Sequence, residues 1–453
     1  MAHLIAAIAT YPQPSAIGVV RLSGEGCFDA LASVFRPRGG KCVAEMEDRK
    51  LTLGNLLDAE GQVLDEVLAT VSRAPHSYTG EDTAELQCHG SPAVLSSALE
   101  ALFRSGAKQA GPGEFTRRAF LNGQLDLSQA EAVIDLIEAQ SARAAQNAAG
   151  QLAGSLTRKI QPIYDGITDI LSHFHAVLDY PDEEIPEFKL SAFRDTLTDS
   201  RDTLEALERS YGRGQFLKNG VPAVILGSPN AGKSSLLNAL AGYERVIVTD
   251  IPGTTRDTVE EAIVLGGHPV RLTDTAGIRS TADAIEEMGV QRSVEAANLA
   301  QLSIFVCDGS RPLTGEDRSA MAEAKKAPLQ IAVINKCDLP LAVQEEDLPF
   351  DTIVTLSAKE GHGLDKLEAA AAALLEDSAP ADGSILTNAR QLAAVVSAKD
   401  SLNAVLVSMD AGFTPDAVLV DAEAALEALG EITGRTMRED VVNRIFERFC
   451  VGK

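Results

Sequence analysis

The sequence predicts a multidomain protein of α/β and all-α parts: a small α/β domain at the N-terminus, a discontinuous helical domain, and a doubly wound, mostly parallel sheet inserted into the helical part. Three observations predict this class. Short β-type runs separated by turns fill the first part of the chain, apolar residues recur at helical spacing on both sides of the middle part, and the middle part opens with an apolar run that enters a glycine-rich loop.

The domain boundaries are expected at the strongest breaks in these patterns. Residues 1–118 form the α/β domain, 119–218 the first helical piece, 219–378 the doubly wound domain and 379–453 the second helical piece. The pattern also fits an alternative in which the two helical pieces are separate.

Composition and charge limit the classes of function. The chain has 453 residues, enough for about three domains, and a formal net charge of −25, which disfavours non-specific binding to a nucleic-acid backbone. A nucleic-acid partner would therefore need a local basic patch or delivery by another protein. Six cysteines without a C-x-x-C pair favour a reducing compartment such as the cytoplasm, and no apolar run reaches the length of a membrane-spanning helix.

The N-terminal domain is expected to contain strands at 17–22, 63–71 and 83–88 and a helix at 92–105. The apolar run at 4–9 lacks a basic start and predicts a strand, not a signal peptide. In the helical pieces we expect helices at 154–178 and 191–211, capping boxes at 128–131 (S-x-x-E) and 436–439 (T-x-x-E), and a helix opened by Thr414-Pro415. The acidic loop at 179–187 predicts a solvated turn or a contact with a partner.

The doubly wound domain is organised around a strand at 223–226 that runs into residues 227–234, whose sequence is G-S-P-N-A-G-K-S. In a G-x-x-x-x-G-K-S loop, backbone N–H groups close on phosphates, the lysine reaches the β- and γ-phosphates, and the serine hydroxyl holds Mg²⁺. A hairpin at 259–265 and 269–273 and strands at 302–307, 330–334 and 353–356 complete the expected sheet, with helices after Lys233, Gly315 and Gly363.

Four further motifs follow in the order that a guanine-nucleotide switch requires. They are Thr254-Thr255, the D-T-A-G run at 274–277, the N-K-C-D run at 335–338 and the S-A-K run at 357–359. Asp338 is placed to accept two hydrogen bonds from guanine, which adenine does not offer, so discrimination on the order of 10⁴-fold against ATP is expected. The set predicts a Ras-like P-loop GTPase domain.

Two positions depart from Ras-type hydrolysis. Ile278 stands where such switches carry the glutamine that orients water, and no arginine finger is identifiable. The carboxylates of 279–287 are the available replacements. Asn230 either helps to bind a monovalent cation beside the β- and γ-phosphates or only shapes the loop.

The whole chain resembles the MnmE (TrmE) family of bacterial tRNA-modification GTPases. The matching stretches are 18–24 (G-V-V-R-L-S-G), 77–82 (S-Y-T-G-E-D), 112–116 (P-G-E-F-T), 227–235, 253–257 (G-T-T-R-D) and 449–453 (F-C-V-G-K). The resemblance implies an N-terminal domain that binds tetrahydrofolate and dimerises, and a FAD-dependent partner, MnmG (GidA), in a heterotetramer. Together such proteins install aminomethyl or carboxymethylaminomethyl groups at C5 of the wobble uridine of tRNAs. The one-carbon unit would come from 5-formyl- or 5,10-methylene-tetrahydrofolate, FAD would enter only through the partner, and no membrane is implied.

The resemblance also implies roles for individual residues. Glu286 would position the hydrolytic water, Ser234 and Thr255 would hold Mg²⁺, and Asn230, Thr249, Ile251 and Thr254 would hold K⁺. The expected GTP-binding set is Asn230, Ala231, Gly232, Lys233, Ser234, Ser235, Thr249, Asp250, Ile251, Pro252, Gly253, Thr254, Thr255, Asp274, Thr275, Ala276, Gly277, Asn335, Lys336, Asp338, Ser357, Ala358 and Lys359.

The implied folate site consists of Arg21, Glu85, Gln124 and Lys453. A pterin edge offers N–H donors to a carboxylate and a folate tail offers carboxylates to cations, whereas Gln124, where some relatives have lysine, supplies no charge. Cys450 is a reactive thiol or a small buried hydrophobe. Two other functions stay open: a ribosome-assembly GTPase of the Era or Der kind, disfavoured by the acidic composition, and a stand-alone folate-dependent aminomethyl transferase that needs no flavin partner.

Overall fold

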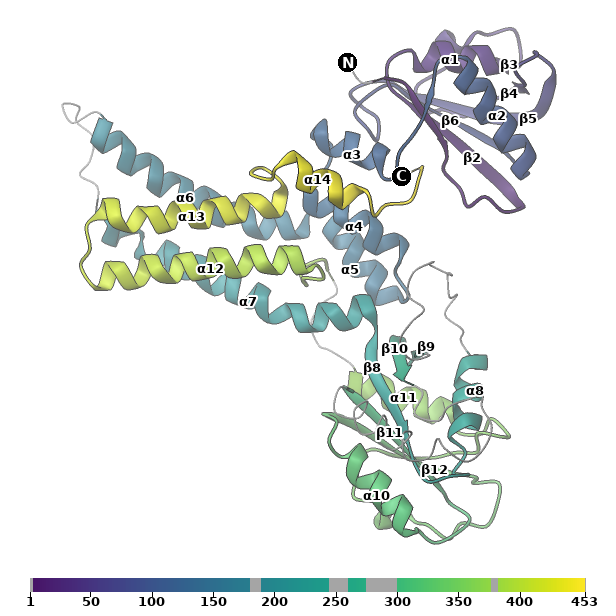
Figure 1. Cartoon of the computed structure of the whole chain (residues 1–453), viewed down its shortest axis with the longest axis vertical. Coiled ribbons are helices and arrows are strands. Elements are labelled where there is room, and N and C mark those ends of the chain that lie inside the picture. The colour runs from purple at the N-terminus through teal and green to yellow at the C-terminus, as the bar shows by residue number, and fades with distance from the viewer. Residues whose placement is uncertain (1–2, 180–188, 244–259, 274–299, 376–381, 453) are drawn as a thin grey trace. The chain divides into compact units, whose positions relative to one another are not determined.

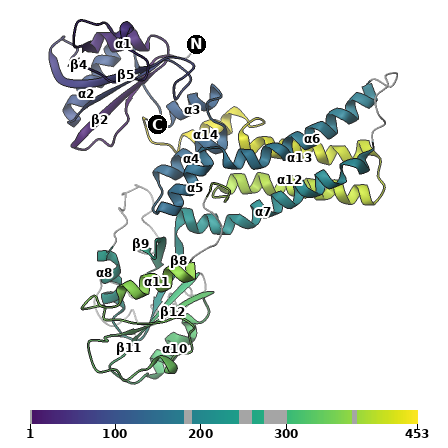
Figure 2. The same ribbon diagram turned by 180° about the vertical axis from the view of Figure 1, so that it is seen from behind.

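The computed structural model describes residues 3–179, 189–243, 260–273, 300–375 and 382–452. The chain divides into two compact units, residues 1–134 with 423–453 and residues 135–422, so the first unit contains both ends of the chain. Figure 1 shows the elements, and Figure 2 shows them from behind.

The first unit contains a seven-stranded sheet in the order β3-β4-β5-β6-β2-β1-β7. Neighbouring strands are antiparallel except for β1 and β7, which are parallel. The predicted strands at 4–9, 17–22, 63–71 and 83–88 are confirmed as β1, β2, β5 and β6. The bounds are β1 Ile5–Ile8, β2 Ser15–Ser23, β3 Phe35–Pro37, β4 Thr52–Leu57, β5 Val63–Ser72, β6 Thr83–Gly90 and β7 Lys108–Gln109.

Buried and partly exposed side chains alternate along the central strands β2 and β6, so the sheet has two different faces. Val20, Leu22 and Leu86 are buried in one core with helices α1 (Cys27–Val34) and α2 (Pro92–Arg104), the second of which was predicted. Because successive side chains of a strand point to opposite faces, Arg21 and Glu85 lie on the other face. That face carries a smaller cluster containing Ile5, Ala7 and Phe115.

Within the second unit, helical segments from before and after the doubly wound domain pack together. Lys399 Nζ of α12 lies 2.7 Å from Glu208 Oε2 of α7, and Gln151 Nε2 of α5 donates to the carbonyl of Ile385 at 2.7 Å. The helices are α3 Glu114–Leu121, α4 Leu127–Ile137, α5 Ala142–Leu152, α6 Ser155–Asp179, α7 Arg194–Asn219, α12 Ala389–Asp410, α13 Pro415–Thr433 and α14 Glu439–Phe446. The helix predicted at 191–211 extends to Asn219, and α3 and α5 were not predicted.

Both predicted capping boxes are wrong. Helix α4 begins at Leu127, where Asp126 Oδ1 accepts from Gln129 N and Gln129 Oε1 accepts from Asp126 N, each at 2.9 Å. Ser128 lies inside the first turn and donates to Asp126. Arg438 is the N-cap of α14 and makes no side-chain capping bond, because a guanidinium has no acceptor to offer. Thr436 lies before the N-cap, and its hydroxyl donates to the carbonyl of Glu427.

Among the described residues, one helix has the length and mean hydropathy of a membrane-spanning segment, contrary to the expectation that no run does. Helix α12 has 22 residues and a mean hydropathy of 1.3 in its most apolar window, although Lys399 and Asp400 interrupt it. One such helix is a weak indication of a membrane span. Helix α12 packs against α7, and its buried residues include Val395, Leu402 and Val405.

The doubly wound domain contains a six-stranded sheet in the order β13-β12-β11-β8-β10-β9, in which only β9 is antiparallel to its neighbour. The mostly parallel sheet and the β9–β10 hairpin are as predicted. The strands are β8 Val221–Leu226, β9 Glu260–Leu265, β10 His268–Thr273, β11 Leu302–Asp308, β12 Leu329–Asn335 and β13 Ile353–Thr355. Helices α8 Lys233–Tyr243, α10 Gly315–Ala324 and α11 Leu364–Leu375 begin where predicted, within one residue.

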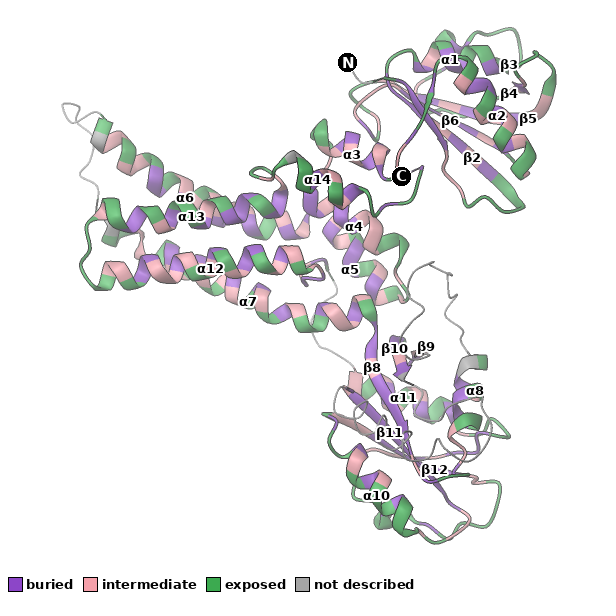
Figure 3. Cartoon of the chain, in the orientation of Figure 1, coloured by how far each residue is buried: buried purple, intermediate pink, exposed green. Residues whose placement is uncertain are grey.

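The central strands β8, β11 and β12 are near-continuous apolar runs because helices cover both faces of a parallel sheet. Every residue of β11 is buried, and β8 is buried almost throughout (Figure 3). One face packs on Leu236 and Leu240 of α8 and Leu367 of α11, and the other on Met321 of α10. This packing fixes the carboxyl ends of β8, β11 and β12, where the predicted nucleotide residues lie.

Candidate functional site

The phosphate loop connects β8 to α8 through two glycines that no other residue could replace without movement. A Cβ at Gly227 would lie 2.1 Å from the Val306 carbonyl oxygen. A Cβ at Gly232, whose φ is +99°, would lie 2.0 Å from Asn335 Nδ2. The loop is therefore held close to β11 and to the loop after β12.

The side chain of Lys233 lies over this loop. Its ammonium donates to the carbonyls of Gly227 at 2.8 Å and Ser228 at 2.9 Å. Burial lowers the pKa of Lys233 below its ordinary value, and the carboxylate of Asp317 partly opposes this. The ammonium of Lys233 thus lies at the phosphate loop, and the buried carboxylate of Asp317 favours the protonated form of Lys233.

The other predicted loop residues differ in exposure. Ser234 and Ser235 are exposed in the first turn of α8, and Ala231 is buried. Asn230 is exposed and has a φ of +60°, a left-handed conformation that asparagine tolerates better than most residues. The amide side chain of Asn230 therefore stands at the surface of the loop.

Asn335 joins the phosphate loop to the two loops predicted to bind guanine. Its Nδ2 donates to the carbonyl of Ala231 at 2.9 Å, and its Oδ1 accepts from the backbone N–H of Ala358 at 3.0 Å. Asn335 is 3% exposed, so these bonds are made in a nearly water-free environment where they are costly to lose. One amide thus holds the 231, 335 and 358 segments together.

Asp338 is exposed at the end of the N-K-C-D run, where it could meet a base. The hydroxyl of Ser357 donates to its Oδ1 at 2.6 Å, and this bond is the main cause that keeps the pKa of Asp338 below its ordinary value. Ser357 is buried, whereas Lys359 is exposed. Asp338 is therefore an ionised acceptor at neutral pH whose orientation is fixed by Ser357.

Sequence reasoning missed three charged residues beneath these loops: Asp308, Arg311 and Asp317. Asp308 Oδ2 lies 2.6 Å from Lys336 Nζ. Burial raises the pKa of Asp308, but hydrogen bonds from Lys336 and Ser310 outweigh it and bring the pKa below the ordinary value. The T-x-x-D pattern at 314–317 is the signal that could have found Asp317, since the two residues cap α10 reciprocally.

Several predicted nucleotide residues lie outside the described residues. They are the 249–255 segment with Thr249, Asp250, Ile251, Pro252, Gly253, Thr254 and Thr255, the 274–277 run with Asp274, Thr275, Ala276 and Gly277, and also Ile278 and Glu286. Among the described residues, no group of three or more His, Cys, Asp or Glu side chains could hold a metal ion.

In the first unit, two of the four predicted folate residues are in direct contact. Arg21 and Glu85 face each other across β2 and β6, with Nε and Oε1 2.8 Å apart. The guanidinium of Arg21 lies 5.7 Å from the ring centroids of both Tyr78 and Phe115. This paired and stacked cation is held in one orientation.

The C-terminal segment reaches the same place. Arg21 Nη1 lies 3.4 Å from the carbonyl oxygen of Gly452, and Val451 forms an antiparallel bridge with Pro112. Cys450 is exposed, and its carbonyl accepts from Gly113 N at 3.2 Å. Gln124 Nε2 lies 3.2 Å from the ideal Cβ position of Gly80, and Lys453 lies outside the described residues.

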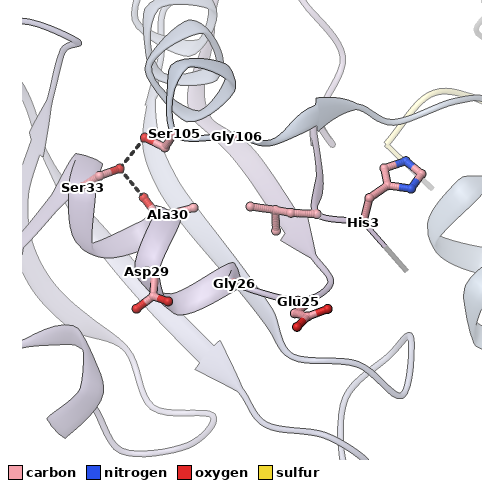
Figure 4. Close-up of a pocket in the computed structure, with 9 residues that line it drawn as sticks. His3, Glu25, Gly26, Asp29, Ala30, Ser33, Ser105 and Gly106 are labelled. Carbon is pink, nitrogen blue, oxygen red and sulfur yellow. Dashed lines mark hydrogen bonds between the residues drawn. The ribbon is translucent and has the colours of Figure 1, made fainter. Parts of the chain in front are cut away.

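A hollow of about 680 Å³ opens elsewhere in the first unit, at the start of α1. His3, Glu25 and Asp29 line it, with the hydroxyls of Ser33 and Ser105 2.6 Å apart (Figure 4). The three predicted folate residues that the structure describes, Arg21, Glu85 and Gln124, do not line this hollow.

Comparisons with known proteins cover the full chain. The family model for the N-terminus of the GTP-binding protein TrmE matches residues 4–124. The family model for the MnmE helical domain matches residues 127–450. Among solved structures, the G domain of the T. maritima FeoB iron transporter is 24% identical over 34% of this chain and 99% of that chain, with a TM-score of 0.27. An Aquifex aeolicus Era variant is 26% identical over 40% of this chain and 65% of that chain, also with a TM-score of 0.27.

Three curated relatives match from end to end, and each is named tRNA modification GTPase MnmE. The relative from Thermoanaerobacter pseudethanolicus is 41% identical over 99% of both chains, that from Roseiflexus sp. is 42% identical over 99% of both, and that from Chloroflexus aurantiacus is 42% identical over 100% of both. Full-length identity at this level, with both family models and a P-loop sheet, shows that the chain belongs to the MnmE family of tRNA modification GTPases.

Proposed function

We propose that this tRNA modification GTPase hydrolyses GTP in a potassium-dependent reaction and acts as a homodimer in a heterotetramer with a FAD-dependent MnmG (GidA) partner. The complex would install carboxymethylaminomethyl or aminomethyl groups at C5 of the wobble uridine of tRNAs. The carbon unit would come from 5-formyl- or 5,10-methylene-tetrahydrofolate. The protein itself would be cytoplasmic.

One observation carries the nucleotide part of the proposal. Asn335 bonds both the phosphate loop at Ala231 and the S-A-K loop at Ala358, so the residues expected at the two ends of a bound GTP form one site. Asp338, ionised and oriented by Ser357, offers the acceptor that guanine N1–H and its amino group require. This arrangement supports specific GTP binding.

The chemistry of hydrolysis is assigned to loops around this site. Lys233 and the loop N–H groups would bind the phosphates, while Ser234 with Thr255 would hold Mg²⁺. Asn230 with Thr249, Ile251 and Thr254 would hold K⁺, which would offset the negative charge that develops during phosphoryl transfer. Glu286 would orient the attacking water that Ile278 cannot orient.

The folate part of the proposal is supported by the chemistry of the Arg21 and Glu85 pair. Glu85 is an acceptor for the N–H edge of a pterin, and Arg21, with Lys453, would supply cations for the carboxylates of the folate tail. Gln124 would contribute a neutral hydrogen bond. Cys450 is exposed near this site and is a candidate reactive thiol.

The decisive test compares GTP hydrolysis in potassium and in sodium at equal ionic strength. We expect turnover to be about 10²-fold slower in sodium, because the charge-stabilising cation would be lost. Asn230→Ala should remove the difference between the salts, and Glu286→Ala should slow turnover while GTP affinity is retained. Equal rates in the two salts would mean that Asn230 only shapes the loop.

The modification chemistry is tested by reconstitution with unmodified tRNA, GTP and a folate donor. Modified uridine should form only when the flavoprotein partner is added. Product formed by the chain alone would replace this proposal with that of a stand-alone folate-dependent transferase.

A further inference from the structure

Arg311 lies beneath the nucleotide site and makes contacts in three directions. Its Nη2 donates to Ser228 Oγ of the phosphate loop at 2.9 Å. Its Nη1 donates to Asp317 Oδ2 at the start of α10, also at 2.9 Å. Its Nε lies 3.9 Å from Asp308 Oδ2 at the end of β11. A single planar guanidinium thus faces a loop, a helix and a strand.

The contact with Ser228 is partly buried, because Arg311 is half-buried while its two partners are enclosed. Ser228 is 4% exposed and Asp317 is 1% exposed, so both are removed from bulk water. Asp317 Oδ2 also accepts from the backbone N–H and hydroxyl of Thr314. Asp317 Oδ1 is buried and accepts no hydrogen bond among the described residues, and the Ser228 hydroxyl is near enough to help lower the pKa of this carboxyl. The phosphate loop, Arg311 and Asp317 therefore form one polar cluster.

The same cluster extends toward the guanine end of the site. Asp308, which faces Arg311 Nε, holds Lys336 of the N-K-C-D run at 2.6 Å and accepts from the hydroxyl of Ser310 at 2.6 Å. Lys336 has a φ of +63°, an unfavourable conformation for lysine, so an external contact has to hold it in place. Arg311 is consequently adjacent to both halves of the nucleotide site.

We propose that Arg311 is a positioning residue for GTP and GDP, which fixes the phosphate loop through Ser228 and supports Lys336 through Asp308. The inference rests on the assignment of residues 227–234 as the phosphate site. Arg311 itself contacts no nucleotide; it holds the loop in the conformation whose N–H groups meet the phosphates. Its loss raises nucleotide dissociation instead of abolishing the fold.

The test measures dissociation of a fluorescent N-methylanthraniloyl-GDP from the full-length protein. Ser228→Ala removes the hydroxyl that Arg311 holds, which also helps to lower the pKa of Asp317. It leaves in place the Arg311–Asp317 pair and the two Thr314 bonds that compensate the buried carboxylate. We expect the dissociation rate constant to rise about tenfold, the size of about 1.4 kcal/mol of lost loop stabilisation. The melting temperature of the nucleotide-free protein should fall by no more than a few degrees, as a loss of this size implies.

Arg311→Lys provides the second variant. Lysine carries the same charge but lacks the planar guanidinium, so it cannot donate to Ser228 and Asp317 in two directions at once. Dissociation of the GDP probe should again accelerate. Adding Ser228→Ala to Arg311→Lys should then have less effect than in the wild type, because the two residues act through one contact. Arg318→Ala, which removes an exposed guanidinium next to Asp317 on the same helix, should leave the rate unchanged.

The outcomes separate this inference from the proposed function. If the wild-type protein fails to bind the GDP probe, the assignment of the phosphate loop is wrong. If the wild type binds and Ser228→Ala dissociates at the wild-type rate, or if the effects of Ser228→Ala and Arg311→Lys are additive, Arg311 has no positioning role. A lowered melting temperature with unchanged dissociation would assign Arg311 to the stability of α10 alone.

Discussion

Lys233 has to be cationic to bind phosphate, and its surroundings act on this charge in opposite directions. Burial lowers its pKa, and the negative charge of Asp317 raises it. Asp317 can do so at every pH near neutrality, because the nearby Ser228 hydroxyl and the hydrogen bonds from Thr314 and Arg311 outweigh burial and bring its own pKa to about 2. The two residues are far apart in the sequence, so the spacing of the G-x-x-x-x-G-K-S motif gives no sign of this coupling.

This coupling predicts a pH dependence of nucleotide affinity. Asp317→Asn removes the negative charge, so the pKa of Lys233 in the free protein should fall further below its ordinary value. The cation binds GTP fully below that pKa and is lost as the pH rises through it. GTP affinity of the variant should therefore decline at a lower pH than that of the wild type, as measured by titration between neutral and alkaline pH.

Arg318→Ala is the matched control for this experiment, and its pH profile should be that of the wild type. A wild-type profile for Asp317→Asn would mean that the carboxylate does not influence Lys233. Melting of both variants at neutral pH shows whether the loss of a capping acceptor at α10 has changed the fold.

At the scale of single elements, the sequence pattern and the observed helix or strand agree best where one interaction dominates. The strands of the doubly wound sheet were predictable because they are buried on both faces and are therefore continuous apolar runs. The start of α4 was not, because the S-x-x-E pattern at 128–131 competes with Asp126, whose carboxylate caps the helix two residues earlier. A capping pattern specifies which residues are able to cap, and tertiary packing decides which of them does.

The loop between β8 and α8 gives a prediction at the same scale. Gly232→Ala would place a methyl group 2.0 Å from Asn335 Nδ2, at a φ of +99° that alanine rarely adopts. The Asn335 bond to Ala231 would then break, and the two halves of the site would separate. We expect GDP affinity, measured with the fluorescent probe, to fall by at least about tenfold.

Gly242→Ala is the matched control on the following helix. Among the described residues, no heavy atom outside the backbone of this helix lies within 4 Å of the added methyl group, and alanine is the better helix former. This variant should bind GDP like the wild type. Wild-type affinity in Gly232→Ala would show that the loop relaxes without loss of the phosphate site.

At the scale of the whole molecule, the sequence could not show which distant segments meet. The resemblance pointed to Arg21, Glu85 and the C-terminus, but pairing of β2 with β6 is what brings Arg21 and Glu85 together, across 64 positions. The C-terminal residues belong to the same compact unit as residues 1–134, although more than 280 positions of the chain lie between them. Local patterns carry no information about such long-range contacts, which depend on the packing of complete elements.

The meeting of the two ends leads to a prediction about folate. Removal of residues 450–453 deletes the Gly452 carbonyl that Arg21 contacts, the Val451 bridge to Pro112 and the cation of Lys453. Arg21 would keep Glu85 and its two rings, so its side chain would stay near its place but lose one of its fixed partners. The truncated protein should bind 5-formyltetrahydrofolate at least about tenfold more weakly, as measured by calorimetry, since a charge-assisted contact and a cation are both lost.

GTP affinity and two point variants show why the truncated protein binds folate more weakly. GTP affinity of the truncated protein should be that of the wild type, because the phosphate and guanine loops belong to the other compact unit. Lys453→Ala should reproduce part of the loss if the terminal cation binds the folate tail, and Glu85→Gln should weaken folate further because an amide cannot accept from two pterin N–H donors as a carboxylate does. Equal folate affinity in the truncated and complete proteins would remove the C-terminus from the site. The contact between Gly452 and Arg21 would then serve only to close the N-terminal unit around its sheet.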